Sequence, residues 1–104
     1  MAKYFYAYHG GKKPETPEAG MEFMNRWRSW MDSLGPAMVD RGYPAGMSKT
    51  LSSEGIADHG GSNPLSGISI VEADTIEAAI EMAKGCPHLD HGTIEIAEAM
   101  DMEM

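Results

Sequence analysis

The chain has 104 residues, which is the size of a single domain, and its 42% hydrophobic and 23% charged residues are typical of a folded globular protein. Its formal net charge of -8 disfavours nucleic acid and anionic membranes as partners, because both attract basic surfaces. No apolar run approaches the roughly 20 residues that a membrane span needs.

The first predicted strand covers residues 3–9, where aromatic residues alternate with other residues. Three tyrosines at even positions share one face, and Phe5 and Ala7 share the other, so both faces of this strand are apolar. Two glycines and a proline in residues 10–14 predict a loop after it.

A helix is predicted next, over residues 16–34. Thr16 supplies a capping hydroxyl and Pro17 suits the first helical position, although Gly20 weakens the first turn and allows a start at Met21. Gly35 ends the helix. The residues expected to be buried have three- and four-residue spacing: Phe23, Met24, Trp27, Trp30, Met31 and Leu34.

The middle of the chain has weaker patterns. We expect a short strand at residues 37–39, a turn at 41–46 and a weak strand at 47–52 on the edge of the sheet. Residues 58–64 are rich in glycine and polar residues and predict a loop.

The clearest strand pattern covers residues 68–73, which are rich in β-branched side chains. Residues 74–77 predict a capping box in which Asp74 accepts from the first turn and Glu77 reaches back. The helix that follows is expected to bury four apolar residues: Ile76, Ala79, Ile80 and Ala83. After Gly85, a last strand covers residues 93–99, and residues 100–104 form a frayed tail.

These elements predict one α+β domain over residues 1–104, with the βαββαβ order of a ferredoxin-like fold and two helices on one face of an antiparallel sheet. Two helices cover only one face of a sheet, yet the first strand is apolar on both. We therefore expect a homodimer that stacks the two uncovered faces, a dimeric α+β barrel, with clefts between sheet and loops.

A series of small and acidic residues runs from Gly67 through the second helix into a Cys-Pro-His segment: Gly67, Glu72, Ala73, Thr75, Glu77, Ala78, Ala83, Lys84, Cys86, Pro87 and His88. In this series the chain resembles the YCII-related domain family. The resemblance implies a ferredoxin-like homodimer. Because a few relatives act on aromatic or chlorinated rings, it also implies a small apolar or aromatic ligand. Two family hallmarks are missing: only Asp58 remains of an Asp-Gly-Pro-Phe loop, and residues 21–34 contain no histidine to pair with an aspartate.

The segment after the second helix is the densest in reactive side chains: Cys86, His88, Asp90 and His91. All four are competent metal ligands, but their spacing matches no established zinc pattern, and we predict neither a metal site nor a cofactor. The alternative is a packed connection in which His88 bonds to the backbone. Cys86 follows the C-terminal end of a helix, whose dipole disfavours a reactive thiolate.

Four residues are candidates for proton transfer: His9, Asp58, His59 and His88. Histidine beside a carboxylate is the minimum for acid–base chemistry near neutral pH. His9 ends the first strand, and Asp58 and His59 lie in the loop before residue 68; these two strands are expected to be central neighbours, so their ends are expected to meet beside a cleft. The alternative is that they are solvated loop residues without a catalytic role.

Four further residues are candidates for ligand binding: Tyr6, Trp27, Trp30 and His91. Aromatic residues line apolar pockets, but at helical spacing they also build ordinary cores. Arg26 and Arg28 either contact an anionic ligand or form a solvated helix face. The methionines of the tail offer Cu(I) ligands, the alternative being a disordered end.

The sequence thus predicts a small-molecule enzyme with acid–base chemistry in a dimer cleft, or alternatively a non-catalytic binding or accessory domain. A purely structural dimer is the third possibility. The N-terminus lacks the apolar region of a signal peptide, and the single cysteine fits a reducing compartment, so we expect a cytoplasmic protein.

Overall fold

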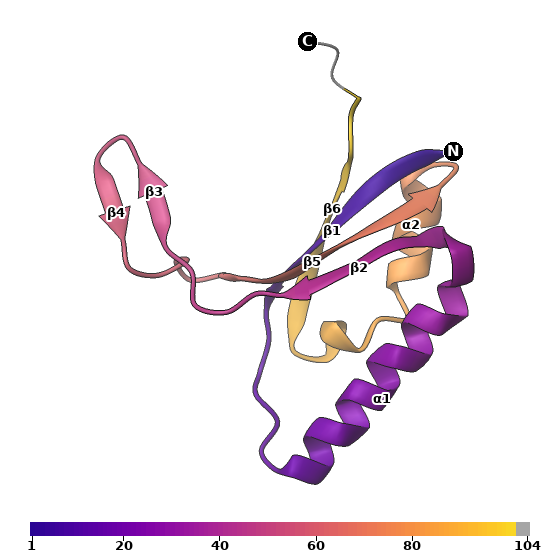
Figure 1. Cartoon of the computed structure of the whole chain (residues 1–104), viewed down its shortest axis with the longest axis horizontal. Coiled ribbons are helices and arrows are strands. Elements are labelled where there is room, and N and C mark those ends of the chain that lie inside the picture. The colour runs from indigo at the N-terminus through magenta and orange to yellow at the C-terminus, as the bar shows by residue number, and fades with distance from the viewer. Residues whose placement is uncertain (102–104) are drawn as a thin grey trace.

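The computed structural model describes residues 1–101. Its centre is a four-stranded antiparallel sheet with the strand order β2–β5–β1–β6 (Figure 1). The elements in chain order are β1 (Ala2–Gly10), α1 (Pro17–Leu34), the 3-10 turn η1 (Gly35–Ala37), β2 (Met38–Pro44), β3 (Thr50–Ser52), β4 (Gly55–Ala57), β5 (Leu65–Ala73), α2 (Ile76–Ala83), the 3-10 turn η2 (Pro87–Asp90) and β6 (Gly92–Glu98). The α+β class is confirmed, and the arrangement is compatible with a ferredoxin-like fold. Of the predicted frayed tail, residues 102–104 lie outside the described residues.

Both helices cover the face of the sheet that carries the tyrosines of β1. Tyr6 is fully buried, and its ring stacks on Trp30 of α1 with 6.2 Å between ring centroids. Its hydroxyl donates to the main-chain carbonyl of Ala79 in α2. Tyr4 and Tyr8 are also buried. The predicted placement of both helices on one face is therefore confirmed.

The other face of the sheet is not covered by a helix and carries apolar side chains beside the His9–Glu95 pair. Phe5 lies opposite Ile70 on one neighbouring strand and Ala97 on the other, and Ala7 lies opposite Ile68. Cross-strand partners share a face, so these side chains form one patch. Phe5 is 37% exposed and Ile68 is 42% exposed. The chain by itself leaves this surface in water.

Helix α1 begins where the threonine cap predicts. The Thr16 hydroxyl accepts a hydrogen bond from the Ala19 amide at 3.1 Å, and Pro17 occupies the first turn. Gly20 does not delay the start. The predicted buried stripe is wrong at Met24, which is 56% exposed. Only Trp30 of this helix is buried, because α1 borders a cavity along part of its length.

Helix α2 differs from its prediction in two ways. Its cap is Thr75, whose hydroxyl accepts from the Ala78 amide at 3.1 Å, and not Asp74. Ile76 and Ile80 are about 40% exposed rather than buried, while Ala79 and Ala83 form the contact with the sheet. Tyr6 reaches the backbone of this helix directly, so the contact row has room only for small side chains.

The segment predicted as a turn at residues 41–46 begins as part of strand β2. The pairing of β2 with β5 shifts register on both sides of Asp40, which marks bulges. Gly42 lies at φ 69°, and a Cβ there would be 1.6 Å from the Ile68 carbonyl oxygen. The glycine and proline that suggested a turn instead allow an irregular edge strand to approach β5.

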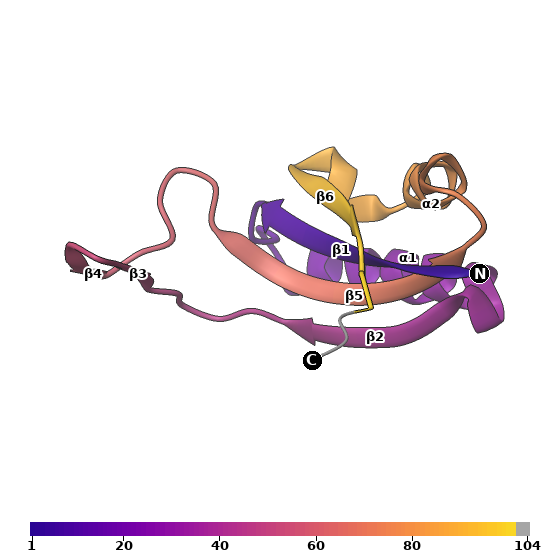
Figure 2. The ribbon, with the colours of Figure 1, turned by 90° about the horizontal axis from the view of Figure 1, so that it is seen from above.

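The strand predicted at residues 47–52 is not part of the main sheet. Strands β3 and β4 pair with each other in a separate hairpin that projects from the body (Figure 1). In Figure 2 this hairpin and α2 lie at opposite ends of the molecule. The radius of gyration is 15.1 Å, above the roughly 13 Å expected for a compact chain of this length. Every residue of the two strands is exposed, including Leu51 at 77% and Ile56 at 66%.

Neither helix of the described residues combines the length and the apolar composition that crossing a membrane would require.

Candidate functional site

A cavity of about 1090 Å³ lies between α1, the ends of β1, β2 and β5, and the segments at the base of the β3–β4 hairpin. Pockets for small ligands usually span roughly 300–1000 Å³, so this one has room for a small molecule. The apolar side chains of its lining include Tyr8, Phe23, Met24, Trp27 and Met31. The lining residues come from five stretches of the chain: 8–14, 23–31, 41–48, 58–69 and 88–91.

Three rings in the cavity lining form one cluster. Tyr8 is the last inward-facing residue of β1, Trp27 lies in the middle of α1, and His88 lies in η2. The centroid distances are 5.1 Å from Tyr8 to Trp27, 5.5 Å from Tyr8 to His88 and 6.2 Å from Trp27 to His88. Tyr8 meets the other two rings edge to face, a favoured geometry for aromatic pairs.

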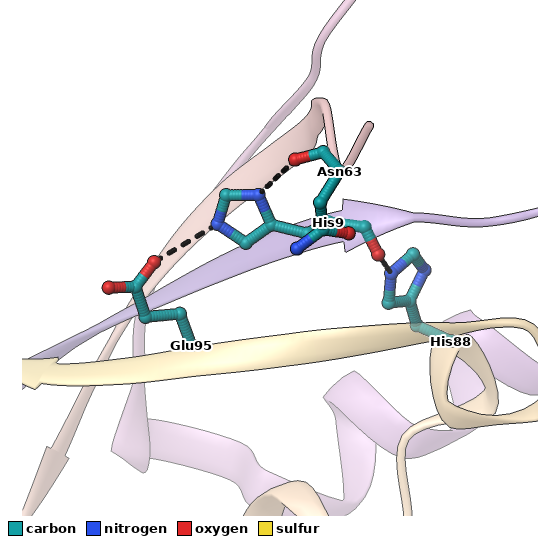
Figure 3. A network of polar contacts seen from close by, with 4 residues as sticks. All are labelled: His9, Asn63, His88 and Glu95. Atoms are coloured by element: carbon teal, nitrogen blue, oxygen red, sulfur yellow. Dashed lines mark hydrogen bonds and ion pairs between the residues drawn. The ribbon is translucent and has the colours of Figure 1, made fainter. Parts of the chain in front are cut away.

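The orientation of His88 is fixed by the main chain of β1. Its Nε2 lies 2.9 Å from the carbonyl oxygen of His9 (Figure 3). A carbonyl only accepts hydrogen bonds, so Nε2 carries the proton and Nδ1 of the neutral ring keeps its lone pair. Gly92 makes this contact possible, because a Cβ there would lie 2.4 Å from Nε2 of His88.

The second nitrogen of His88 is not completely enclosed. Within residues 1–101, Nδ1 has no hydrogen-bond partner, whereas every fully buried side-chain nitrogen or oxygen in that range has one. Nδ1 is therefore not sealed in the core, although the residue as a whole is only 7% exposed. His88 lines the cavity, so a ring of defined tautomer borders the space that a ligand would occupy.

A chain of hydroxyl groups runs along the cavity wall. The Tyr8 hydroxyl donates to Ser69 Oγ at 3.1 Å, and Ser69 donates to the Arg41 carbonyl at 2.9 Å. Burial raises the pKa of Tyr8 well above its ordinary value, and the bond to Ser69 offsets this only in part. Tyr8 therefore stays protonated and acts as a hydrogen-bond donor. Sequence analysis missed Ser69, although a polar residue at an inward position of a β-branched strand is a usable signal.

His9 does not face the cavity. Its ring lies between the Asn63 carbonyl, 3.1 Å from Nδ1, and the Glu95 carboxylate, 3.1 Å from Nε2 (Figure 3). Both partners accept hydrogen bonds, so the ring donates to both only when doubly protonated. His9 contacts His88 through its main-chain carbonyl and not through its ring.

Asp58 and His59 lie on the rim of the cavity, at the base of the hairpin. Asp58 pairs with Lys49 at 3.2 Å, and Nδ1 of His59 accepts a hydrogen bond from the Gly61 amide at 2.9 Å. Both groups are exposed. They contact neither the rings nor the hydrogen bond of the cluster around His88.

The four ligand-binding candidates divide into two pairs. Trp27 and His91 line the cavity. Tyr6 and Trp30 do not; both are buried, and the Trp30 indole donates to the Met82 carbonyl at 2.9 Å. Arg26 pairs with Asp90 at 2.8 Å and ties α1 to η2.

The Cys86–His91 segment is a packed connection, as its alternative interpretation predicted. Cys86 and Pro87 are buried, and His88 bonds to backbone. Burial raises the pKa of the Cys86 thiol to about 11, so it remains protonated near neutral pH. Among residues 1–101, no three His, Cys, Asp or Glu side chains are grouped closely enough to hold a metal ion. The Cu(I) hypothesis concerns a tail whose last two methionines, Met102 and Met104, lie outside the described residues.

No family model matches the chain, and no curated protein matches it significantly. The geometry of the residues above is therefore the basis for assigning a function.

Proposed function

We propose that the chain is a small-molecule enzyme in which the cavity binds a compound with an aromatic or apolar body and His88 accepts a proton from it. The observation that carries this proposal is the bond from His88 Nε2 to the His9 carbonyl, which leaves Nδ1 unprotonated beside the cavity. A general base must present a lone pair at a defined position, and a fixed tautomer supplies that. Tyr8 and Trp27 provide flat apolar walls around it.

The proposed assembly is a ferredoxin-like homodimer of the YCII-related type. Its support is the Cys-Pro-His series of the sequence together with the uncovered apolar face around Phe5 and Ile68. An exposed apolar patch on a sheet is stabilised when a second copy covers it. The exposed apolar residues of the β3–β4 hairpin favour the same conclusion, because an isolated two-stranded hairpin is at best marginally stable in water.

A second candidate function is ligand binding without catalysis. It is favoured by the low exposure of His88, of which only 7% is accessible and which two aromatic rings flank. The same cavity and the same wall residues serve this function.

One experiment separates the two candidates. The probe is 2-tetralone, an aromatic ketone whose carbon acid exchanges hydrogen for deuterium in D₂O when a base removes its proton. Binding is followed by tryptophan fluorescence, and exchange is followed by proton NMR. We expect the wild-type protein to bind the ketone and to accelerate exchange.

The decisive variant is His88→Gln, because the glutamine amide can still donate to the His9 carbonyl but offers no basic nitrogen. It should retain binding and lose the acceleration, while His9→Gln, which changes a ring outside the cavity, should keep both. Binding without acceleration in the wild type would support the non-catalytic alternative. Absence of binding would contradict the proposed site.

A further inference from the structure

The cavity lining contains more basic than acidic residues, whereas the whole chain contains more acidic than basic residues. The chain has 8 Lys and Arg residues and 16 Asp and Glu residues. Four of the basic residues line the cavity: Lys12, Lys13, Arg28 and Arg41. Asp58 is the one acidic residue among the cavity-lining residues of the described chain. The lining of this cavity is therefore more positive than the acidic chain as a whole.

Two of these cations already have partners. Arg41 contacts the Asp32 carboxylate at 2.7 Å, and Lys12 contacts Glu15 at 3.5 Å. Arg28 and Lys13 form no ion pair within residues 1–101, so their charges are available to a ligand. Asp58, in turn, is neutralised by Lys49 at 3.2 Å. The cavity therefore presents two uncompensated cations, one from α1 and one from the loop after β1.

The two cations and the apolar wall lie on the same cavity. Arg28 is adjacent in sequence to Trp27, and Phe23 and Met31 line the wall on the same helix. A ligand that contacts both kinds of surface has an apolar body and an anionic group. The guanidinium of Arg28 suits a planar carboxylate, to which it can donate two parallel hydrogen bonds.

We propose that the natural ligand of this cavity is an aromatic carboxylate, held by its ring against Trp27 and by its anionic group near Arg28 and Lys13. This inference rests on the proposed function, because it names the ligand of the same cavity. A chain with a net charge of -8 repels anions at long range, and positive side chains in the cavity lining oppose this repulsion locally.

The test compares two probes of nearly the same shape, 1-naphthoate and the neutral 1-naphthamide, by tryptophan fluorescence titration at low ionic strength. We expect the wild-type protein to bind naphthoate at least about tenfold more tightly than naphthamide, the ratio that 1.4 kcal/mol produces. Added salt should reduce this preference, because it screens exposed charges.

The variant Lys13→Gln/Arg28→Gln should bind both probes with similar affinity. Both side chains are on the surface, so thermal unfolding of this variant should match the wild type. Lys84→Gln is the matched control, since it removes one positive charge at the end of α2, outside the cavity lining, and should leave the preference unchanged. Equal binding of the two probes by the wild type would overturn the carboxylate inference and leave the cavity function intact. Binding of neither probe would overturn both.

Discussion

A hydrogen bond of 2.9 Å joins Nε2 of His88 to the main-chain carbonyl of His9, 79 positions away in the sequence. The two histidine rings therefore lie on opposite sides of the sheet and are linked through the His9 main chain. His9 supplies a backbone acceptor while its ring binds Glu95 on the uncovered face. His88 uses that acceptor to hold its tautomer beside the cavity.

The close approach at Gly92 gives the first prediction. A methyl group there would lie 2.4 Å from His88 Nε2 and 2.5 Å from the His9 carbonyl oxygen. Gly92→Ala should therefore displace His88 and lower the free energy of unfolding by about 1–3 kcal/mol, as overpacking does. Gly46→Ala, where a Cβ has no neighbour within 4 Å, should stay within about 0.5 kcal/mol of the wild type. Urea unfolding of the two variants measures the difference, and equal stabilities would contradict the described contact.

The hydrogen bond itself is tested by two substitutions of His88. His88→Leu removes the donor to the His9 carbonyl and should destabilise the fold by about 1–3 kcal/mol. His88→Gln keeps a donor at a similar distance along the side chain and should cost less. Chemical denaturation of both variants orders them, and a glutamine variant less stable than the leucine variant would argue that the ring is held by packing alone.

The buried thiol of Cys86 makes stability depend on alkaline pH. Its pKa is raised by burial from 9.0 to about 11, so the unfolded chain loses the thiol proton before the folded chain does. Stability from this group is complete below pH 9 and is lost as pH rises toward 11, by on the order of 2–3 kcal/mol. Cys86→Ala should therefore be less stable than the wild type at pH 7 and should approach it by pH 11. A gap that stays constant over this range would contradict the shift.

Modification of Cys86 by a thiol reagent provides an independent check. The side chain is 3% exposed, so the folded protein at pH 8 should react far more slowly than the protein in urea. Equal rates would show that the segment before η2 opens readily.

The proposed dimer predicts that glutamate substitutions at two isoleucines of similar exposure will affect dimer formation differently. Ile68 is 42% exposed on the uncovered face of the sheet, and Ile76 is 39% exposed at the start of α2 on the opposite layer. Ile68→Glu should convert dimer to monomer, because the charge would be buried between copies. Ile76→Glu should leave the dimer intact. Sedimentation equilibrium of the three proteins decides the matter, and a monomeric wild type at micromolar concentration would refute the dimer.

The sequence predicts the layer that the helices cover because side-chain alternation in a strand is strict. The tyrosines of β1 are all buried on one face, and Phe5 is left on the other. The same alternation places the His9 side chain on the face of Phe5, away from the cavity. Its odd position in the strand was therefore enough to exclude the His9 ring from the site. The threonine before Pro17 was equally informative, since Thr16 caps α1, whereas α2 is capped by Thr75 in place of the predicted Asp74.

Other features depended on contacts that no local pattern contains. The bulged course of β2 depends on how closely Gly42 approaches Ile68, and composition alone favours a turn there. The outward position of Ile80 follows from Tyr6 reaching the backbone of α2. Lys13, from the loop after β1, and Arg28, from α1, line the same cavity. The overall charge of -8 gives no sign of this local positive charge.

The most direct measurement is the pair of tryptophan indole signals in a two-dimensional ¹H–¹⁵N NMR spectrum during titration with 1-naphthoate. Trp27 lines the cavity, whereas Trp30 is buried and its indole donates to the Met82 carbonyl, so one serves as reporter and the other as internal reference. A ligand bound where the cavity is described should move the Trp27 signal in a saturable manner and by more than the Trp30 signal, whose ring centroid lies 5.6 Å from that of Trp27. An unchanged Trp27 signal at millimolar probe would contradict the assignment of this cavity as the functional site.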